Sequence, residues 1–214
     1  MEHDMLPHEI EATSMRIIQA ELTGRGITLA HDCKDIILRV IHATADFDFA
    51  HIMQFSHGVC EQAATLFQTA APVIITDTNM ALAGINKRTC AALHISAACY
   101  MADKDVADAA ARHGTTRAQE SVNKMARIYA DTEKPVVFVC GNAPTALMRL
   151  CALMQDRTFT PALVIGVPVG FVHVEEAKEQ LAASPVPYII TSGRKGGSTV
   201  AAAICNALLY KAAQ

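Results

Sequence analysis

Apolar residues in the first third of the chain recur with the period of an α-helix. The segment PHEIEATSMRIIQAEL carries Ile10, Ile17 and Ile18 on one face, together with the hydroxyl of Ser14. The same period continues in two later segments before it is lost near residue 70. The helices predicted for this N-terminal third span about residues 7–22, 32–43 and 58–69.

Beyond residue 70, short apolar runs alternate with helical stretches. The runs that indicate buried strands are 72–76, 136–140, 162–167 and 187–191, with a possible fifth at 95–101. The helices predicted between or after them span about residues 103–113, 116–130, 144–155, 174–183 and 198–212. This alternation is typical of an α/β fold. We therefore expect a mainly parallel sheet of about five strands, flanked by helices and preceded by a helical N-terminal third.

Composition favours one globular domain over residues 1–214. The chain is 51% hydrophobic and 18% charged, and it contains no repeat, linker or low-complexity segment. Its net charge of −3 offers no electrostatic footprint for nucleic acid or an anionic membrane. The longest apolar run, 160–172, is interrupted by two prolines and two glycines, and is too short to span a membrane. The acidic start MEHDMLPHEIE does not resemble a secretion signal, so we expect a cytoplasmic protein.

Cysteine and histidine spacing argues against a resident metal. The seven cysteines form no CxxC pair and lie mostly in apolar runs, which predicts reduced thiols in the core. The nine histidines form no HExxH motif and do not cluster with cysteine. We expect no protein-bound metal.

The turns that follow three predicted strands have unusual sequences: CGNAPTAL, GVPVGFV and SGRKGGST. Ligands of open α/β sheets bind outside the carboxyl ends of the strands, where such turns lie. In the first turn, Asn142 is expected to cap a helix that starts at Pro144, which would leave backbone amides facing outward.

The third turn has the composition of an anion site. Its three glycines flank Arg194 and Lys195, and Ser198 is expected to cap the helix that follows. The alternative is that the glycines only shape the turn, and the basic pair favours the anion site. Neither GxGxxG nor GxxxxGK[ST] occurs, so a nucleotide site lacks its usual fingerprint.

His42 is the candidate for acid–base chemistry. If residues 32–43 are helical, Arg39 and His42 lie on one flank, beside the buried stripe of isoleucines and Val40. An imidazole, with an unperturbed pKa of about 6.5, exchanges protons near neutrality. Arg39 would disfavour its charged form and Asp46 would favour it, which leaves the balance open. The alternative is a solvated helix flank near a C-terminus, where cations are favoured in any case.

Ser14 also has two interpretations. Its hydroxyl could bond back to its own helix or face a ligand. The motif GxSxG is absent, so we do not expect acyl transfer.

Seven segments in order along the chain resemble the precorrin-8X methylmutase family, also called precorrin isomerases, of cobalamin biosynthesis. They span about residues 7–210 and read PHEIEATSMRII, RVIHATADFDF, TDTNMALAGINKR, TTRAQESV, GNAPTAL, GVPVGFV and GRKGGSTVAAAICNALLY. TADFDF, TDTNMALAGINKR and GRKGGS are most similar to the branch that acts on cobalt-precorrin-8. HVEEAK at 173–178 departs from the family's usual GAAESK, which puts the local geometry around His173 in doubt.

The resemblance implies an isomerase that moves a methyl group from C-11 to C-12 of the macrocycle, giving cobyrinate, or hydrogenobyrinate from the metal-free substrate. It implies a homodimer of α/β fold and no cofactor, since any cobalt arrives inside the substrate. It makes His42 the proton donor or acceptor, and Ser14 and Arg39 substrate contacts. The further contacts it implies are Arg117, Gly141, Asn142, Thr145, Gly193, Arg194, Gly196, Gly197 and Ser198.

Two other functions compete with this interpretation. A nucleotide-dependent α/β protein would use GRKGGS for phosphate, and the missing fingerprints count against it. A tetrapyrrole carrier would bind the same corrinoid without converting it, so only turnover separates it from the enzyme. A corrinoid rimmed by carboxylates suits both, because guanidiniums and free amides bind carboxylates.

Overall fold

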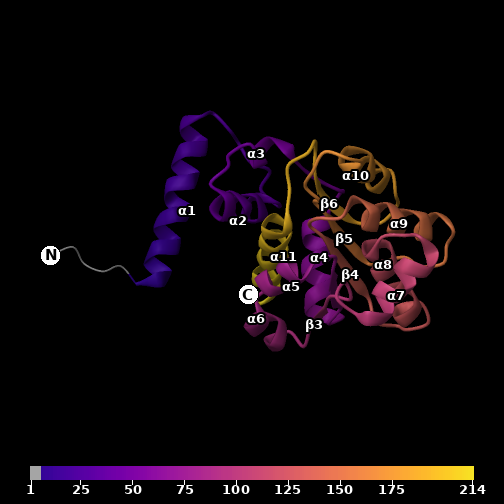
Figure 1. Ribbon diagram of the computed structural model, residues 1–214. Helices are drawn as coiled ribbons and strands as arrows, with labels where there is room; N and C mark the ends of the chain where they lie inside the picture. Colours follow the sequence, from indigo (N-terminus) through magenta and orange to yellow (C-terminus); the bar gives the residue numbers. More distant parts are fainter. Residues whose placement is uncertain (1–5) are drawn as a thin grey trace.

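The computed structural model describes residues 6–214, apart from the side chains of Pro7 and His8. Its described part contains one six-stranded sheet with the order β1-β6-β5-β4-β2-β3 (Figure 1). The strands are β1 Met53–Phe55, β2 Val73–Thr76, β3 Ser96–Ala98, β4 Val136–Cys140, β5 Leu163–Gly166 and β6 Tyr188–Thr191. All neighbours pair in parallel except β1, which runs antiparallel to β6.

The five predicted strands are confirmed, and β1 is a sixth that the pattern did not reveal. Its sequence MQF is too short to show an alternation of apolar and polar residues. What makes it a strand is its pairing with β6, in which Met53 lies opposite Thr191. Central strands β2, β4 and β5 are buried at every residue, as expected for a parallel sheet covered on both faces.

The eight predicted helices form with ends within two residues of expectation. They are α1 Pro7–Gly24, α2 Lys34–Thr44, α4 Val59–Thr69, α7 Lys104–His113, α8 Arg117–Tyr129, α9 Pro144–Gln155, α10 Val174–Ala182 and α11 Ser198–Ala212. Three shorter helices were not predicted, because four to six residues do not establish a helical period: α3 Phe49–Ile52, α5 Asn79–Gly84 and α6 Lys87–Ala92.

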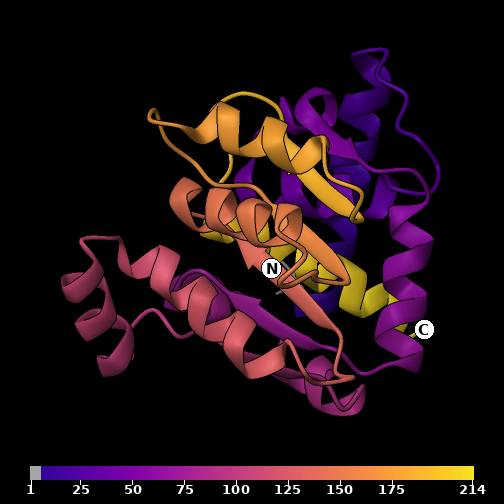
Figure 2. The same ribbon diagram turned by 90° about the vertical axis from the view of Figure 1, so that its right-hand side faces the viewer.

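Side chains from alternate positions of the sheet enter two hydrophobic clusters. On β4, Val137 and Val139 pack with α2, α4 and α11 on one face. Val136, Phe138 and Cys140 pack with α8, α9 and α10 on the other. In Figure 2, α8, α9 and α10 lie in front of the sheet, with α11 behind it. The sheet therefore lies between two helical layers.

Helix α1 stands apart from this body and packs onto α2 (Figure 1). Ile18 and Leu22 form the packed face, with Met15 partly buried beside them. The expectation that Ile10 and Ile17 share the face of Ile18 is wrong, because these two side chains are 51% and 59% exposed whereas Ile18 is buried. Among the described residues, no helix is both long and apolar enough to cross a membrane.

Candidate functional site

The turns after β2, β4, β5 and β6 all leave the carboxyl edge of the sheet. In chain order, β3 is added on one side of β2, whereas β4, β5 and β6 follow one another on the other side. The turns after β2 and β4 thus leave from the point where the winding direction changes. In open α/β sheets this point is where ligands bind.

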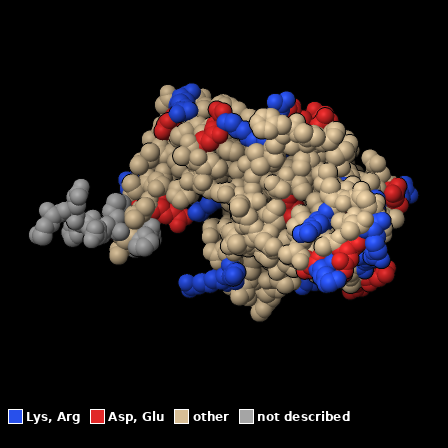
Figure 3. Space-filling view, in the orientation of Figure 1, with Lys and Arg blue, Asp and Glu red and all other residues tan. Residues whose placement is uncertain are grey.

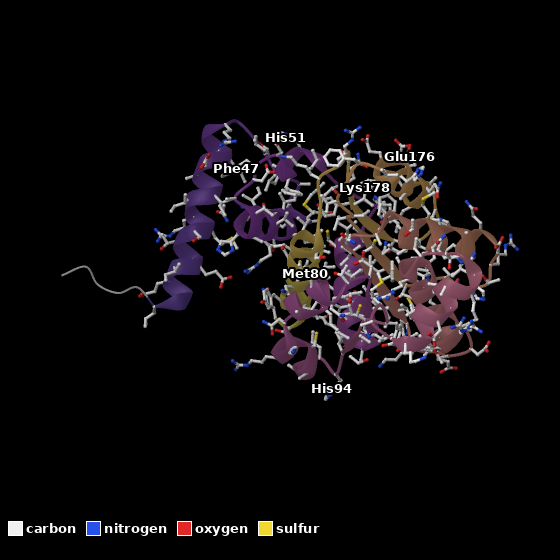
Figure 4. All side chains as sticks on the ribbon, viewed as in Figure 1. Phe47, His51, Met80, His94, Glu176 and Lys178 are labelled. Carbon is white, nitrogen blue, oxygen red and sulfur yellow. The ribbon has the colours of Figure 1, made fainter. Side chains whose placement is uncertain are left out.

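A cavity of about 260 Å³ opens where α2, α5 and α11 meet. Its lining residues are Arg39, Ala43, Met80, Gly84, Ser198, Thr199, Ala202, Ala203, Asn206 and Tyr210. Met80, which is 70% exposed, is labelled in Figure 4. The small side chains along α11 leave room for a ligand beside this helix.

Arg39 is the main basic group of this cavity. Its guanidinium lies 2.7 Å from a Glu11 carboxylate oxygen on α1 and 5.0 Å from the centre of the Tyr210 ring. Arg39 and Tyr210 also line a second cavity of about 250 Å³ between α1, α2 and α11. Figure 3 shows the surface hollowed between α1 and the rest of the molecule. Arg39 therefore connects two adjoining hollows and keeps N–H donors beyond the one that faces Glu11.

His42 lies in the last turn of α2 with its side chain exposed. Arg39 lies one helical turn before it and lines both cavities, whereas His42 is not among the lining residues of either. The Asp46 carboxylate accepts a hydrogen bond from Lys195 at 2.6 Å. This bond is the main reason why the pKa of Asp46 is lowered. Asp46 is therefore already engaged by a lysine.

Ser14 uses its hydroxyl within its own helix. The Oγ donates to the carbonyl oxygen of Ile10 at 2.9 Å, which was the first of its two interpretations. This bond leaves the lone pairs of the hydroxyl oxygen able to accept a further hydrogen bond.

In the turn after β6, both basic side chains have carboxylate partners. Arg194 donates to Glu175 at 3.0 Å, and Lys195 donates to Asp46 and Asp48 at 2.6 Å each. These contacts tie the turn to α10 and to the loop that follows α2. The side chains of Arg194 and Lys195 are 60% and 47% exposed, so solvent and ligands still reach them.

The predicted helix cap at Ser198 is wrong. The N-cap is Gly197, at φ 125°, and Ser198 is the first residue of α11. The Ser198 hydroxyl is instead 2.9 Å from the hydroxyl of Thr78, which itself caps α5. The two helix N-termini are thereby joined beside the cavity.

The expectation that the turn after β4 points free amides outward is also wrong. The amides of Gly141, Asn142 and Ala143 donate to the buried carboxylate of Asp77, at 2.9, 2.8 and 2.7 Å. The cap of α9 is Ala143 rather than Asn142. The amides that were predicted to bind a ligand are therefore already hydrogen-bonded to the Asp77 carboxylate.

Asp77 was not predicted from the sequence to take part in the site. A signal was present, since Asp77 directly follows the buried strand β2 at the winding change. Gly141 is the second part of this arrangement, because a Cβ there would lie only 2.7 Å from the Cα of Ser198. Asp77 thus shapes a turn that packs directly against the start of α11.

Arg117 and Thr145 form a separate group. Arg117 is the exposed first residue of α8, and its N-cap Thr116 lies 3.2 Å from the Thr145 hydroxyl at the start of α9. Buried Glu120 accepts hydrogen bonds that fix the preceding turn, including one from Thr115 at 2.9 Å. Neither Arg117 nor Thr145 lines the cavity that contains Arg39.

A larger cavity of about 440 Å³ lies between α5, α6 and β3. Its lining is mostly apolar and includes none of the residues predicted for the site. We therefore centre the candidate site on the cavity of Arg39 and Ser198, which combines basic and hydroxyl groups.

Comparison with known proteins identifies the family of this chain. A family model described as precorrin-8X methylmutase matches residues 9–211. The cobalt-precorrin-8 methylmutase of Salmonella typhimurium is 44% identical over 98% of each chain, and that of Leptospira interrogans is 37% identical over 95% of this chain and 93% of its own. A crystal structure of precorrin-8X methyl mutase from Thermus thermophilus aligns with a TM-score of 0.84 at 36% identity, covering 95% of this chain and 97% of that chain. Sequence and fold agree over nearly the whole chain, which therefore belongs to the precorrin-8X methylmutase family.

Proposed function

We propose that this protein converts cobalt-precorrin-8 into cobyrinate by moving a methyl group from C-11 to C-12 of the macrocycle. Membership of the family makes the chain a methylmutase, an isomerase of cobalamin biosynthesis. Both relatives described above are named for the cobalt-containing substrate, which favours it over precorrin-8X. The observation that carries the proposal is the family match over residues 9–211.

In this proposal, Arg39 binds a carboxylate at the periphery of the corrinoid. Its guanidinium is partly buried, with 24% of the side chain exposed, so its interactions are screened less than those of a fully solvated group. Ser198 and Asn206 add polar groups to the same cavity. Arg117 and Arg194 are candidates for carboxylates farther out on a macrocycle with several acidic side chains, since both lie exposed at the carboxyl edge of the sheet.

The proposed role of His42 is to give a proton to the macrocycle or to take one from it. A methyl migration within one molecule needs neither a nucleophile nor a redox group. It needs the π-system biased toward the product, and a positioned imidazole provides this by proton transfer. A proton returned after the migration leaves substrate and product as isomers. The proposal needs no resident cofactor, because cobalt enters as part of the substrate.

The proposal also includes a homodimer and a cytoplasmic location. Helix α1 exposes Ile10 and Ile17 on its outer face, and such apolar side chains suit contact with a second copy. Light scattering coupled to size-exclusion chromatography measures the mass of the particle in solution and so tests the proposed homodimer.

The cytoplasmic location is supported by the cysteines. The seven cysteines are free thiols, which suits a reducing compartment.

Turnover tests the proposed function. The purified protein is incubated with cobalt-precorrin-8 and, in parallel, with precorrin-8X, while the visible spectrum and the product mass are followed. We expect conversion of cobalt-precorrin-8 to cobyrinate. Binding without conversion of either substrate would show a carrier instead. A nucleotide-dependent protein would be revealed by a thermal shift with nucleotides, which we do not expect.

A further inference from the structure

Lys178 on α10 is a buried cation that the proposed mechanism does not use. Only 2% of the residue is exposed. Its Nζ donates hydrogen bonds to the carbonyl oxygens of Gly193 and Lys195, at 2.7 and 2.9 Å. Figure 4 labels Lys178 close to this turn. The side chain thus reaches the turn after β6 from its interior side.

Among the described residues, Lys178 forms no ion pair with a carboxylate. Burial is the main reason why its pKa is lowered to about 8, and the nearby carboxylate of Glu175 acts in the opposite direction. Its ammonium is held by two backbone carbonyls instead. A buried charge without a counter-ion is costly, so an anion placed nearby would be stabilised by it.

The other groups around Lys178 are committed elsewhere. In the turn, Arg194 and Lys195 point to Glu175, Asp46 and Asp48. The Sγ of Cys140 on β4 lies 3.5 Å from a carboxylate oxygen of Asp77. The same carboxylate accepts hydrogen bonds from three backbone amides. On α9, which packs against α10, the titratable residues are Arg149, which donates to Asn123, and Cys151, which is buried in the core.

The turn held by Lys178 leads directly into the cavity. Thr191 donates to the same Lys195 carbonyl at 2.7 Å, and the Gly197 amide donates to the carbonyl of Val167 at 2.9 Å. The next residue, Ser198, lines the cavity that contains Arg39. The shape of the turn therefore sets where α11 begins.

We propose that Lys178 is a positioning residue of the corrinoid site, which holds the 193–197 turn from within and places a positive charge behind it for a substrate carboxylate. The inference rests on the proposed function and adds a residue to its binding site. Lys178 acts through the turn, since its Nζ is covered by the carbonyls of Gly193 and Lys195.

The pH dependence of product binding tests this role. The Kd for cobyrinate is measured by spectroscopic titration at several pH values from about 6.5 to about 9.5, a range that includes the pKa of Lys178. Below pH 8 the ammonium is charged and favours an anion. Above pH 8 the charge is lost in the free protein, so the wild-type Kd should rise by about tenfold between pH 7 and pH 9. The kcat should change less than KM, because the charge acts on binding.

Two variants separate the charge from the fold. Lys178→Met keeps a similar volume without charge, and its Kd should be raised already at pH 7 and stay flat with pH. Lys178→Arg stays charged throughout, so it should keep binding at pH 7 and lose the rise above pH 8. Circular dichroism checks folding, and the Arg variant together with the wild-type profile still tests the inference if the Met variant does not fold.

A flat wild-type profile, or a Lys178→Met profile parallel to that of the wild type, would overturn the role of Lys178 and leave it as a structural lysine. Failure of the proposed function looks different. In that case the wild-type protein would neither bind cobyrinate nor convert cobalt-precorrin-8 at pH 7.

Discussion

The basic side chains near the cavity differ in how firmly they are held and how far they are solvated. Arg39 is 24% exposed and lies between Glu11 and the Tyr210 ring. Arg194 and Lys195 are 60% and 47% exposed. Because water screens exposed charges, Arg39 should contribute more to carboxylate binding than either of the other two.

Replacing Arg39 should therefore weaken corrinoid binding. Arg39→Ala should cost about 1.5 to 3 kcal/mol of binding free energy, the range for hydrogen bonds to charged groups. Titration of the visible spectrum with cobyrinate measures this loss. Arg127→Ala, the same change at an exposed position of α8, should leave Kd unaltered. Equal affinities of wild-type protein and Arg39→Ala would remove Arg39 from the site.

Replacing His42 should slow the reaction more than it weakens binding. His42→Ala should lower kcat by roughly 10² to 10⁴, the usual contribution of general acid–base catalysis. Folding should be retained because the side chain is exposed. Kd for cobyrinate should change little, since a proton donor acts mainly in the transition state.

His51→Ala on α3 is the matched control, because it removes another exposed histidine. It should isomerise at the wild-type rate. The same rate in His42→Ala would show that His42 is only a solvated residue at the end of α2.

At the scale of elements, the carboxylate of Asp77 joins the end of β2 to the turn between β4 and α9. Three amides donate to it, and two of these belong to the buried residues Gly141 and Ala143. Asp77→Asn replaces one acceptor oxygen by a donor that faces other donors. The free energy of unfolding should fall by about 2 to 4 kcal/mol.

Urea denaturation measures this fall. Asp131→Asn, in the exposed loop after α8, should change the free energy of unfolding by no more than about 0.5 kcal/mol. If Asp77→Asn were as stable as this control, the three hydrogen bonds would not hold the turn.

The close contact of Gly141 with the start of α11 leads to a second prediction about how the elements pack. A methyl group at Gly141 would lie 2.7 Å from the Cα and 2.9 Å from the amide nitrogen of Ser198, and neither backbone atom can move without shifting the helix. Gly141→Ala should cost about 1 to 3 kcal/mol in stability, as for other overpacked sites. It should also raise KM, because Ser198 lines the cavity.

Gly24→Ala provides the comparison for the same chemical change. Gly24 is the last residue of α1, and a Cβ there meets no atom within 4 Å. The Gly24→Ala variant should be as stable as the wild type or slightly more stable. If Gly141→Ala were tolerated equally well, the start of α11 would be free to move.

At the scale of the whole molecule, the site depends on segments that are far apart in the chain. Lys195 contacts Asp46 across 149 positions and thereby links the turn before α11 to the loop after α2. α2, α5 and α11 all contribute to one cavity. The sheet makes this possible, since its parallel strands bring their carboxyl ends to one edge.

The two hydrophobic clusters share the same strands, and this predicts cooperative unfolding. Val137 and Phe138 are adjacent on β4 but belong to opposite clusters, so neither layer can be lost without exposing the other. Scanning calorimetry should show one transition, with the calorimetric enthalpy equal to the van't Hoff enthalpy. Scans at several protein concentrations separate dissociation of subunits from unfolding. Two resolved transitions would contradict the single domain expected from the sequence.

The sequence alone was enough to predict the longer helices, five of the strands and one local part of the candidate site. Strands such as VVFVC and helices of nine or more residues carry their period within a few neighbouring positions, so they were predictable. The pairing of Arg39 with His42 on one flank of α2 is equally local, because helical geometry alone sets it. The motifs that indicate the family were also present in the sequence itself.

Contacts between groups far apart in the chain could not be predicted from the sequence and depend on the folded arrangement. Asp77 receives the amides of residues 141–143, Lys178 holds the turn after β6, and β1 becomes a strand by pairing with β6. Contacts such as that between Asp77 and Gly141, which are 64 positions apart, leave no periodic trace in the sequence. Any buried donor needs some acceptor, but which one it finds depends on how the whole chain packs around the sheet.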